Sequence, residues 1–258
     1  MMKTQHLGFI GGGRVTRILL QAFKNKALNL ESVKVFDPDP GTISALRNDF
    51  PDLEPVSSPG EAAEQEIVFL AVHPPVMMES IGKITERLSS STIVISLSPK
   101  ITIEKMATVL PTTKIIRMIP NATSFINKGY NPITFHASFS KKEKKAITKL
   151  LKNAGKTIEV EEPMLEGYAI VSAMLPTYFW FQWKKLEEIA VQTGFTKAQA
   201  EKVIHKTLKR SLKLYYKSDL SPEEVIDLIP VKPIGDREAE IEQMLETKLL
   251  GLYEKIKP

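Results

Sequence analysis

The stretch His6-Leu7-Gly8-Phe9-Ile10-Gly11-Gly12-Gly13-Arg14-Val15-Thr16 decides the fold of this chain. An apolar run leads into three consecutive glycines, and a helical pattern begins near Arg14. Gly11 permits a tight turn, and Gly13 lets the backbone approach a diphosphate whose charge then lies at a helix N-terminus. The third small position of this fingerprint is Thr16 in place of Gly or Ala, a departure from the usual pattern. The stretch therefore predicts a strand–turn–helix that binds a dinucleotide.

A carboxylate follows the next strand-like run. Val33–Phe36 lies about 20 residues after the glycine turn and is followed directly by Asp37. A carboxylate there accepts hydrogen bonds from both hydroxyls of an adenosine ribose and repels a 2′-phosphate, and Asp39 adds to the repulsion. This favours NAD(H), with NADP(H) as the alternative cofactor. The structural alternative is a glycine turn without a ligand, beside an Asp that only caps a proline-rich turn.

Strand-like and helix-like segments alternate outward from this stretch. Nearly continuous apolar runs separated by amphipathic segments predict a parallel sheet with helices on both faces. The expected strands are Leu7–Ile10, Val33–Phe36, Ile67–Val72, Ile93–Leu97, Ile115–Met118 and a weaker Ile133–Phe135. The expected helices between them are Val15–Asn25, Thr42–Asp49, Val76–Leu88 and Ile103–Val109. Together with the glycine turn, this alternation predicts an N-terminal Rossmann dinucleotide-binding domain.

Only helical patterns occur from about Pro163 onward, and capping boxes mark helix starts at Ser140, Thr196 and Ser221. The expected C-terminal helices are Met164–Gln192, Ala198–Ser218, Pro222–Ile229 and Arg237–Ile256. The charged stretch Glu159–Pro163 is the predicted boundary. The predicted fold class is α/β, with the Rossmann domain over residues 1–160 and an all-helical substrate and dimerisation domain over 161–258.

The composition excludes several kinds of site. The 258 residues include no cysteine, which rules out disulfides, thiolate metal sites and a cysteine nucleophile. The four histidines are isolated, so no metal is expected. The net charge of +5 is spread among acidic residues, so nucleic acid is not an expected partner. No signal peptide fits the N-terminus and no run approaches the roughly 18 apolar residues of a membrane span, so we expect a soluble cytoplasmic protein without a membrane partner.

A further strand end, at Ile67–Pro75, adds to the expected nucleotide site, because it lies beside the cofactor at the carboxyl edge of the sheet. His73 is expected at the nicotinamide ribose or the phosphates, with a turn histidine that binds nothing as the alternative. Arg14 is expected to add a phosphate contact. The residues expected to bind the cofactor are Gly11, Gly12, Gly13, Arg14, Val15, Asp37, Ala71, Val72, His73 and Pro74.

These motifs resemble the pyrroline-5-carboxylate reductase family over nearly the whole chain. The family opens with a motif like Gly8–Gly13, and it has a strand like Phe69–Val72 followed by Lys-Pro, where this chain has His-Pro. Its Arg-x-Met-Pro-Asn motif is similar to Arg117–Asn121, and its Ser-Gly-Ser-Gly-Pro-Ala-Tyr segment to Ser172–Tyr178. The resemblance implies an NAD(P)H-dependent reductase that delivers hydride to a cyclic imine, forming L-proline in proline biosynthesis. It also implies that Asn121 orients the nicotinamide and that subunits pair as a homodimer through their helical domains.

Two departures from the family concern the small-molecule substrate. Ala173, Met174 and Leu175 are bulkier than the family's residues, which with backbone amides bind the substrate carboxylate. The family's Ser-Pro-Gly-Gly-Thr-Thr loop corresponds to Val231–Arg237, with Asp236 where a substrate-contacting threonine is expected. The cofactor site is retained, whereas the chain either reduces a different imine or is a diverged relative without activity.

Hydride transfer to a protonated imine depends on alignment more than on a strong general acid. The candidate catalytic residues are Ser172 and Thr177, as hydrogen-bond donors, and Asp236, which would hold an iminium by charge, while Lys232 or Arg237 would hold a carboxylate. The alternatives are that Asp236 caps the last helix, that the two cations are solvated, and that the hydroxyls bond the preceding helical turn.

The segment Tyr178–Trp183 places aromatic side chains all round a helix, so it should be buried on several sides. Core packing together with a subunit interface is favoured over an aromatic cofactor box, which supports the homodimer.

Two other functions compete with the imine reductase. One is another Rossmann oxidoreductase, such as a β-hydroxyacid dehydrogenase or a deazaflavin-dependent reductase. The former should carry a catalytic Lys on the first interdomain helix with an Asn one turn later, but Lys184 and Lys185 lie beyond the aromatic segment and no Asn follows. The other is a non-catalytic dinucleotide-binding protein, which the absence of turnover with imines and keto acids would distinguish.

Overall fold

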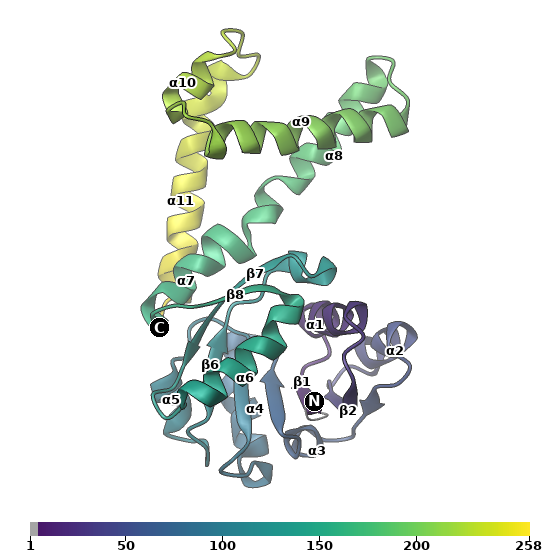
Figure 1. The fold of residues 1–258 in the computed structure, drawn as a ribbon, viewed down its shortest axis with the longest axis vertical. Coiled ribbons are helices and arrows are strands. Elements are labelled where there is room, and N and C mark those ends of the chain that lie inside the picture. Colours follow the sequence, from purple (N-terminus) through teal and green to yellow (C-terminus); the bar gives the residue numbers. More distant parts are fainter. Residues whose placement is uncertain (1–4) are drawn as a thin grey trace. The chain divides into compact units, whose positions relative to one another are not determined.

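A mixed sheet forms the centre of the first part of the chain (Figure 1). The computed structural model describes residues 5–258. Within that range the sheet has eight strands in the order β3-β2-β1-β4-β5-β6-β7-β8, and every neighbouring pair is parallel except β6 and β7. The strands are β1 (Gln5–Ile10), β2 (Leu30–Phe36), β3 (Glu54–Pro55), β4 (Ile67–Leu70), β5 (Ile93–Ser96), β6 (Ile115–Met118), β7 (Gly129–Phe135) and β8 (Gly155–Glu159). The α/β class predicted from the sequence is confirmed.

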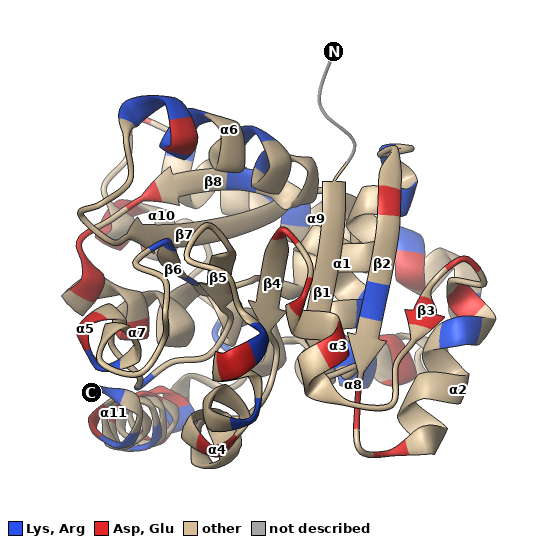
Figure 2. Ribbon diagram, turned by 90° about the horizontal axis from the view of Figure 1, so that it is seen from below, with Lys and Arg blue, Asp and Glu red and all other residues tan. Residues whose placement is uncertain are grey.

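Helices cover both faces of this sheet, because side chains along each strand alternate between two apolar cores. Phe9 belongs to the core shared with α1, α2 and α6, whereas its neighbour Ile10 belongs to the core shared with α3, α4 and α5. Phe9 stacks on Phe69 of β4 with ring centroids 4.6 Å apart. The helices are α1 (Arg14–Asn25), α2 (Pro40–Asp49), α3 (Pro59–Ala63), α4 (Pro74–Ile84), α5 (Ile103–Ala107) and α6 (Lys141–Leu151). Figure 2 shows that the charged segments of α6 are mostly basic, with one acidic segment among them.

The strands differ from the sequence expectation mainly at the two ends of the sheet. β3 and β8 were not expected, and the weak run Ile133–Phe135 is the end of a seven-residue strand, β7. β8 begins at Gly155, whose φ of +134° and close approach to Gly129 exclude a side chain. A strand that starts on such a residue and then alternates in polarity lacks the continuous apolar run by which the other strands were found.

The chain forms two compact units whose bounds differ from the expected 1–160 and 161–258. The first unit comprises residues 1–174 together with Leu252–Pro258, and the second comprises Leu175–Gly251. The chain therefore leaves the first unit after Met174 and returns to it at Leu252. Ile256 packs on a small apolar cluster of the first unit that contains Ile119, Leu165 and Ala169.

The helix expected over Met164–Gln192 is interrupted. It consists of α7 (Leu165–Tyr168), a π-helical turn over Ala169–Ala173, a 3₁₀ turn over Leu175–Tyr178 and α8 (Trp180–Gln192). Pro176 accounts for the break, because proline has no N–H to continue a helix and its ring conflicts with the carbonyl four residues earlier. The prediction of one continuous helix over Met164–Gln192 was therefore wrong.

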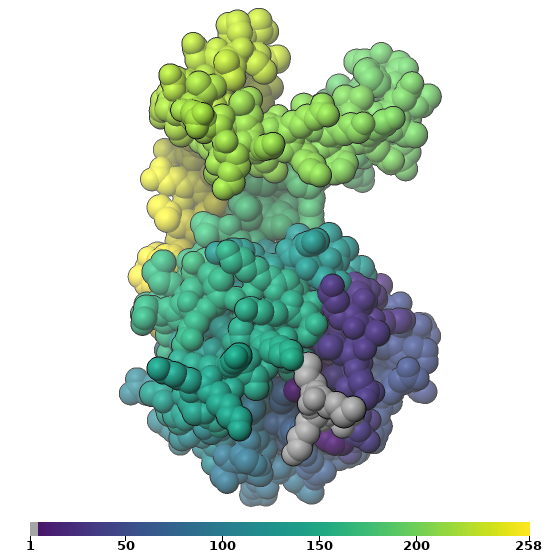
Figure 3. Space-filling model, viewed as in Figure 1, coloured from purple at the N-terminus to yellow at the C-terminus, as the bar shows by residue number. Residues whose placement is uncertain are grey.

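The second unit is built from α8, α9 (Lys197–Lys217), α10 (Pro222–Asp227) and most of α11 (Glu238–Ile256). The capping boxes predicted at Thr196 and Ser221 are both present. α8, α10 and α11 bury no residue, and α9 buries only Ala200 among the described residues. The side chains of α9 and α10 cover the face of this unit that is turned to the viewer in Figure 3. None of the described helices is both long and apolar enough to cross a membrane.

Candidate functional site

The turn after β1 is built for glycine at its first position. Gly11 has a φ of +102°, and its N–H donates to the Phe36 carbonyl at 2.7 Å. A Cβ at Gly11 would lie 2.5 Å from the carbonyl oxygen of Ala71, so no side chain fits there. The chain thus turns between the ends of β2 and β4, at the carboxyl edge of the parallel strands, where dinucleotides bind in this class of sheet.

Thr16 occupies the third small position of the fingerprint for a structural reason. Its buried hydroxyl donates to the carbonyl of Gly11 at 2.6 Å. A Gly or Ala at this position would let the helix approach the strand but would leave that carbonyl without this bond. The departure from the fingerprint therefore stabilises the same turn by another contact.

Gly13 is the residue that leaves room for a ligand. It is the N-cap of α1, no side chain caps the helix there, and a Cβ built on Gly13 would meet no atom within 4 Å. The contrast is Gly8 in β1, where a Cβ would lie 1.9 Å from the Ala62 carbonyl oxygen, so that glycine serves packing. Open space before the amides of a 12-residue helix fits a diphosphate, because those amides carry partial positive charge.

A cavity of about 810 Å³ lies over this helix terminus. Its lining combines the glycine turn with the start of α1, the inner side of α2 and the end of β4. The lining residues are Gly12, Gly13, Arg14, Val15, Arg17, Thr42, Ala45, Leu46, Asn48, Asp49, Ala71 and His73. The structure thus brings together most of the residues expected from the two separate strand ends. Val72 lies beneath the turn, with its Cγ1 3.3 Å from a Cβ built on Gly11, and Pro74 begins α4.

Both oxygens of Asp37 are engaged in the turn. Oδ2 accepts from Gly12 N at 2.8 Å, and Oδ1 accepts from Asp39 N at 2.9 Å. Asp39 caps α2 by accepting from Gly41 N and the Thr42 hydroxyl, and these hydrogen bonds, the Thr42 bond first, lower the pKa of its carboxyl. Two carboxylates therefore stand at the end of β2, where a ribose or its 2′-phosphate would lie.

A buried ion-pair cluster under the site was not expected from the sequence. Arg117 in β6 is fully buried and pairs with Glu166 of α7 and, at 2.9 Å, with Glu162. Glu166 also accepts from Lys100 N at 3.0 Å, and Glu162 accepts from Ile103 N at 2.8 Å. The sequence does contain an indication of a buried ion pair, because Arg117 is the one charged residue in an otherwise apolar strand. The cluster ties α7 to the carboxyl end of the sheet.

Lys100 is held in an unusual backbone conformation by this cluster. Its φ is +80°, a left-handed value that glycine adopts readily and lysine does not. It follows β5 at the same edge of the sheet as the glycine turn. Its N–H bond to Glu166 holds the loop in place.

The remaining candidates fall in both units. Asn121 follows β6 and is buried, and its Nδ2 donates to the carbonyl of Ser172 at 2.8 Å. Ser172 lies in the π-helical turn of the first unit, where its hydroxyl donates to the Tyr130 carbonyl. Thr177 and Asp236 belong to the second unit, Thr177 in the 3₁₀ turn and Asp236 in the turn before α11, with its carboxylate 3.6 Å from Arg237.

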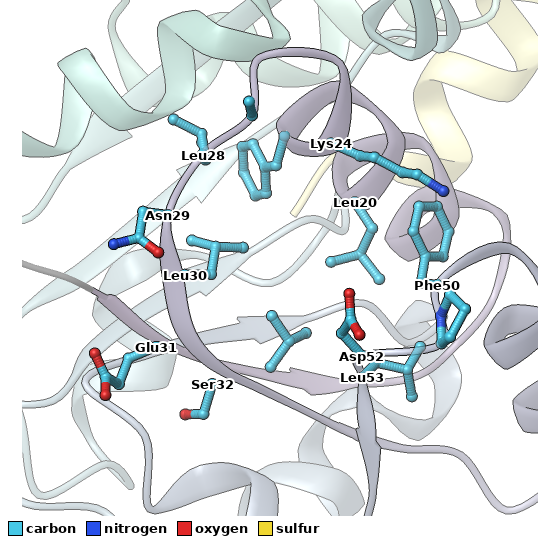
Figure 4. A pocket seen from close by; sticks show the side chains of 14 residues that line it. Leu20, Lys24, Leu28, Asn29, Leu30, Glu31, Ser32, Phe50, Asp52 and Leu53 are labelled. Atoms are coloured by element: carbon cyan, nitrogen blue, oxygen red, sulfur yellow. The ribbon is translucent and has the colours of Figure 1, made fainter.

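A second cavity, of about 390 Å³, lies at the opposite edge of the sheet (Figure 4). It is lined by the end of α1, by Leu28–Val33 at the start of β2, and by Phe50–Leu53. Lys24 spans part of it, donating to the Asp49 carbonyl and lying over the Phe50 ring. This cavity lies at the amino ends of the parallel strands, whereas the glycine turn follows the carboxyl end of β1. Within residues 5–258 no group of three or more His, Asp or Glu side chains forms a metal site.

Sequence comparisons agree with this geometry. Residues 6–100 match the family model described as NADP oxidoreductase, coenzyme F420-dependent. The pyrroline-5-carboxylate reductase of Escherichia coli (strain K12) is 26% identical over 226 residues, covering 86% of this chain and 84% of the relative. The chain is similar to pyrroline-5-carboxylate reductases over most of its length.

Solved structures of pyrroline-5-carboxylate reductases share the fold. The Plasmodium falciparum protein, solved with NADP bound, has a TM-score of 0.82 at 21% identity and covers 100% of this chain and 98% of its own. The Streptococcus pyogenes protein has a TM-score of 0.78 at 19% identity, with 97% of both chains covered. The likeness therefore includes the helical part as well as the Rossmann part.

Proposed function

We propose that this chain is an NAD(P)H-dependent reductase that transfers hydride to the C=N carbon of a small cyclic imine, such as pyrroline-5-carboxylate, to give L-proline. The observation that carries the proposal is the open helix terminus at Gly13 above a glycine turn that admits no side chain at Gly11. When bound, the dinucleotide supplies the hydride. The similarity to a curated pyrroline-5-carboxylate reductase, which covers 86% of the chain, supports the choice of a C=N substrate.

Each part of the first unit has a task in this proposal. The amides of the Gly11–Val15 turn bind the diphosphate, and Arg14 at the first turn of α1 adds a positive charge. Asp37 accepts the ribose hydroxyls, which favours NAD(H) over NADP(H). His73 and Ala71 line the same cavity further along the nucleotide.

The substrate groups are proposed from the segments that differ from the family pattern. Thr177 donates a hydrogen bond to the substrate, and Ser172 does so by turning its hydroxyl away from the Tyr130 carbonyl. Asp236 holds the iminium by charge. Asp236 is exposed, with its side chain 78% accessible, and is paired with Arg237 only at 3.6 Å.

The test begins with Gly13→Ala. The substitution leaves the fold intact, because the added methyl group meets no protein atom, but it occupies the space a diphosphate needs. We expect an unchanged melting temperature and a loss of NADH affinity of roughly tenfold or more in titration calorimetry, equivalent to about 1.4 kcal/mol. The matched control is Gly82→Ala in α4, whose methyl group is equally free of contacts. Unchanged NADH affinity in Gly13→Ala would remove the diphosphate from this turn.

Turnover separates the reductase from its alternatives. Purified protein should oxidise NADH when given pyrroline-5-carboxylate or a related cyclic imine. Tight NADH binding with no turnover over a panel of imines and keto acids would favour a non-catalytic dinucleotide-binding protein. Turnover with a hydroxy or keto acid alone would favour another Rossmann oxidoreductase.

We also propose that the second unit pairs with a second copy of the chain. The side chains of Phe181, Leu212, Tyr216 and Ile229 are between 59% and 69% exposed, although all are large and apolar. Four helices that bury a single alanine cannot form a core of their own, so another surface must cover them. Sedimentation at micromolar concentration should give a dimer, and Leu212→Glu should weaken it. A stable monomer would contradict the pairing.

A further inference from the structure

The π-helical turn at Ala169–Ala173 leaves a carbonyl without its usual partner. In an α-helix the carbonyl of Ser172 would accept from the N–H of residue 176. That residue is Pro176, which has no N–H. The turn is wider than an α-helical turn, with Met174 N donating to the Ala169 carbonyl five residues back at 3.0 Å. Such turns inside helices occur often at functional sites.

Asn121 supplies the missing donor from a distant part of the chain. Its Nδ2 donates to the Ser172 carbonyl at 2.8 Å and lies 3.2 Å from the Ser172 hydroxyl. Its Oδ1 accepts from the backbone N–H of Thr123 at 2.9 Å and from the Thr123 hydroxyl at 2.6 Å. Its own N–H donates to Asn131 Oδ1 at 2.9 Å. The buried amide thus joins the loop after β6 to the turn through which the chain leaves the first unit.

We infer that Asn121 is a positioning residue, which holds the Ala169–Ala173 turn open and so fixes Ser172, rather than a residue that orients the nicotinamide by direct contact. The inference rests on the proposed function, since it concerns the same reaction. Both ends of the Asn121 amide already have protein partners, which leaves it little capacity for a ligand. An amide suits this role, because its oxygen accepts while its nitrogen donates.

The first test is Asn121→Asp, which has nearly the same shape. The carboxylate still accepts from Thr123, but its second oxygen faces the Ser172 carbonyl, and two acceptors repel. We expect kcat/KM for the imine to fall roughly 10- to 100-fold, with the NADH dissociation constant within about threefold of wild type. An equal loss of NADH affinity would mean that Asn121 contacts the nucleotide, and the inference would be wrong.

Thr123→Val is the matched control. It removes the hydroxyl donor to Oδ1 and leaves the Nδ2 bond to Ser172 in place. We expect kcat/KM to stay within about twofold of wild type, because the hydroxyl contacts with Asn121 Oδ1 and the Lys128 carbonyl are lost while the turn is still held. A loss as large as that in Asn121→Asp would indicate a general structural role of the loop and would overturn the assignment.

Pro176→Ala in the Asn121→Ala background separates stability from activity. The alanine that replaces the proline restores an N–H four residues after Ser172, so the carbonyl gains a local partner and the turn closes toward an α-helix. We expect the double variant to recover the melting temperature lost in Asn121→Ala, while kcat/KM stays low. Recovery of both quantities would show that the open turn is not required.

Hydrogen exchange keeps the inference testable if no imine is reduced. In that case the proposed reaction fails, but Asn121→Asp should still speed exchange at Met174, whose N–H closes the π-helical turn. Unchanged protection of that amide would overturn the role of Asn121 independently of any substrate.

Discussion

Asp37 and Gly12 are joined by a hydrogen bond in which Oδ2 of the carboxylate accepts from the glycine N–H at 2.8 Å. The residue proposed to choose between nucleotides is therefore also part of the turn proposed to bind the diphosphate. A change at Asp37 affects two steps of cofactor binding, and the two can be separated only by comparing the two cofactors with one another.

Asp37→Ser should shift the preference toward NADPH. The substitution removes a ribose acceptor and a negative charge that repels a 2′-phosphate, so the ratio of kcat/KM for NADPH to that for NADH should rise roughly tenfold or more. The loss of the hydrogen bond to Gly12 should weaken the binding of NADH and NADPH equally, so this effect cancels in the ratio. Asp39→Asn is the control: it keeps an α2 cap and should raise the ratio less. An unchanged ratio in Asp37→Ser would place the ribose elsewhere.

Glu166→Ala should strongly destabilise the first unit. Glu166 is 1% exposed and Arg117 is fully buried, so the substitution leaves a buried guanidinium short of a partner. We expect the free energy of unfolding in urea to fall by about 3–5 kcal/mol. Glu162→Ala should cost less, because that side chain is 26% exposed and its loss leaves the Glu166 pair intact. Equal costs for the two variants would contradict this interpretation of the cluster.

Lys100→Gly should stabilise the protein. The left-handed φ of +80° costs a lysine about 1–2 kcal/mol, and glycine avoids this while losing about 0.5–1 kcal/mol of chain entropy on folding. The net gain in the free energy of unfolding should be about 0.5–1 kcal/mol. Lys105→Gly in α5 is the control and should destabilise, because that residue lies in a helix. A destabilised Lys100→Gly protein would mean that the lysine side chain compensates for its backbone.

Glu143 should contribute a defined part of the acid unfolding curve. A hydrogen bond from Lys114, followed by bonds from the side chain and backbone of Ser140, lowers the pKa of the Glu143 carboxyl from 4.5 to about 2. This stabilisation is complete above the unfolded-state value of 4.5 and is lost as the pH falls toward 2, because the unfolded state then binds the proton first. In Glu143→Gln the free energy of unfolding should vary less steeply with pH across that window. Parallel curves for the two proteins would exclude the contribution.

The part of the fold that the sequence predicts is the part with strong local patterns. β1, β4, β5 and β6 are mostly apolar, and the glycine turn has a fingerprint, so the carboxyl edge of the sheet could be placed from the sequence alone. Asp37 could be placed beside the glycine turn because it comes directly after β2. The capping boxes at Ser140, Thr196 and Ser221 were equally local and are all present.

The features that were missed depend on contacts between distant residues. Asn121 meets Ser172 across 51 positions and Arg117 meets Glu166 across 49, and neither pair has a spacing that a helix or strand would reveal. The break in the helix at Ala169–Ala173 depends on Pro176. The prediction of a continuous helix did not take this proline into account. The roles of Ser172, Thr177 and Asp236 stay predictions, because they depend on contacts with a substrate.

The return of Leu252–Pro258 to the first unit makes residues 175–251 an insertion within it rather than an appendage. Ile256 completes a cluster whose other members were synthesised about 80 to 140 positions earlier on the chain. During translation, the cluster therefore lacks Ile256 until the whole of residues 175–251 has been synthesised.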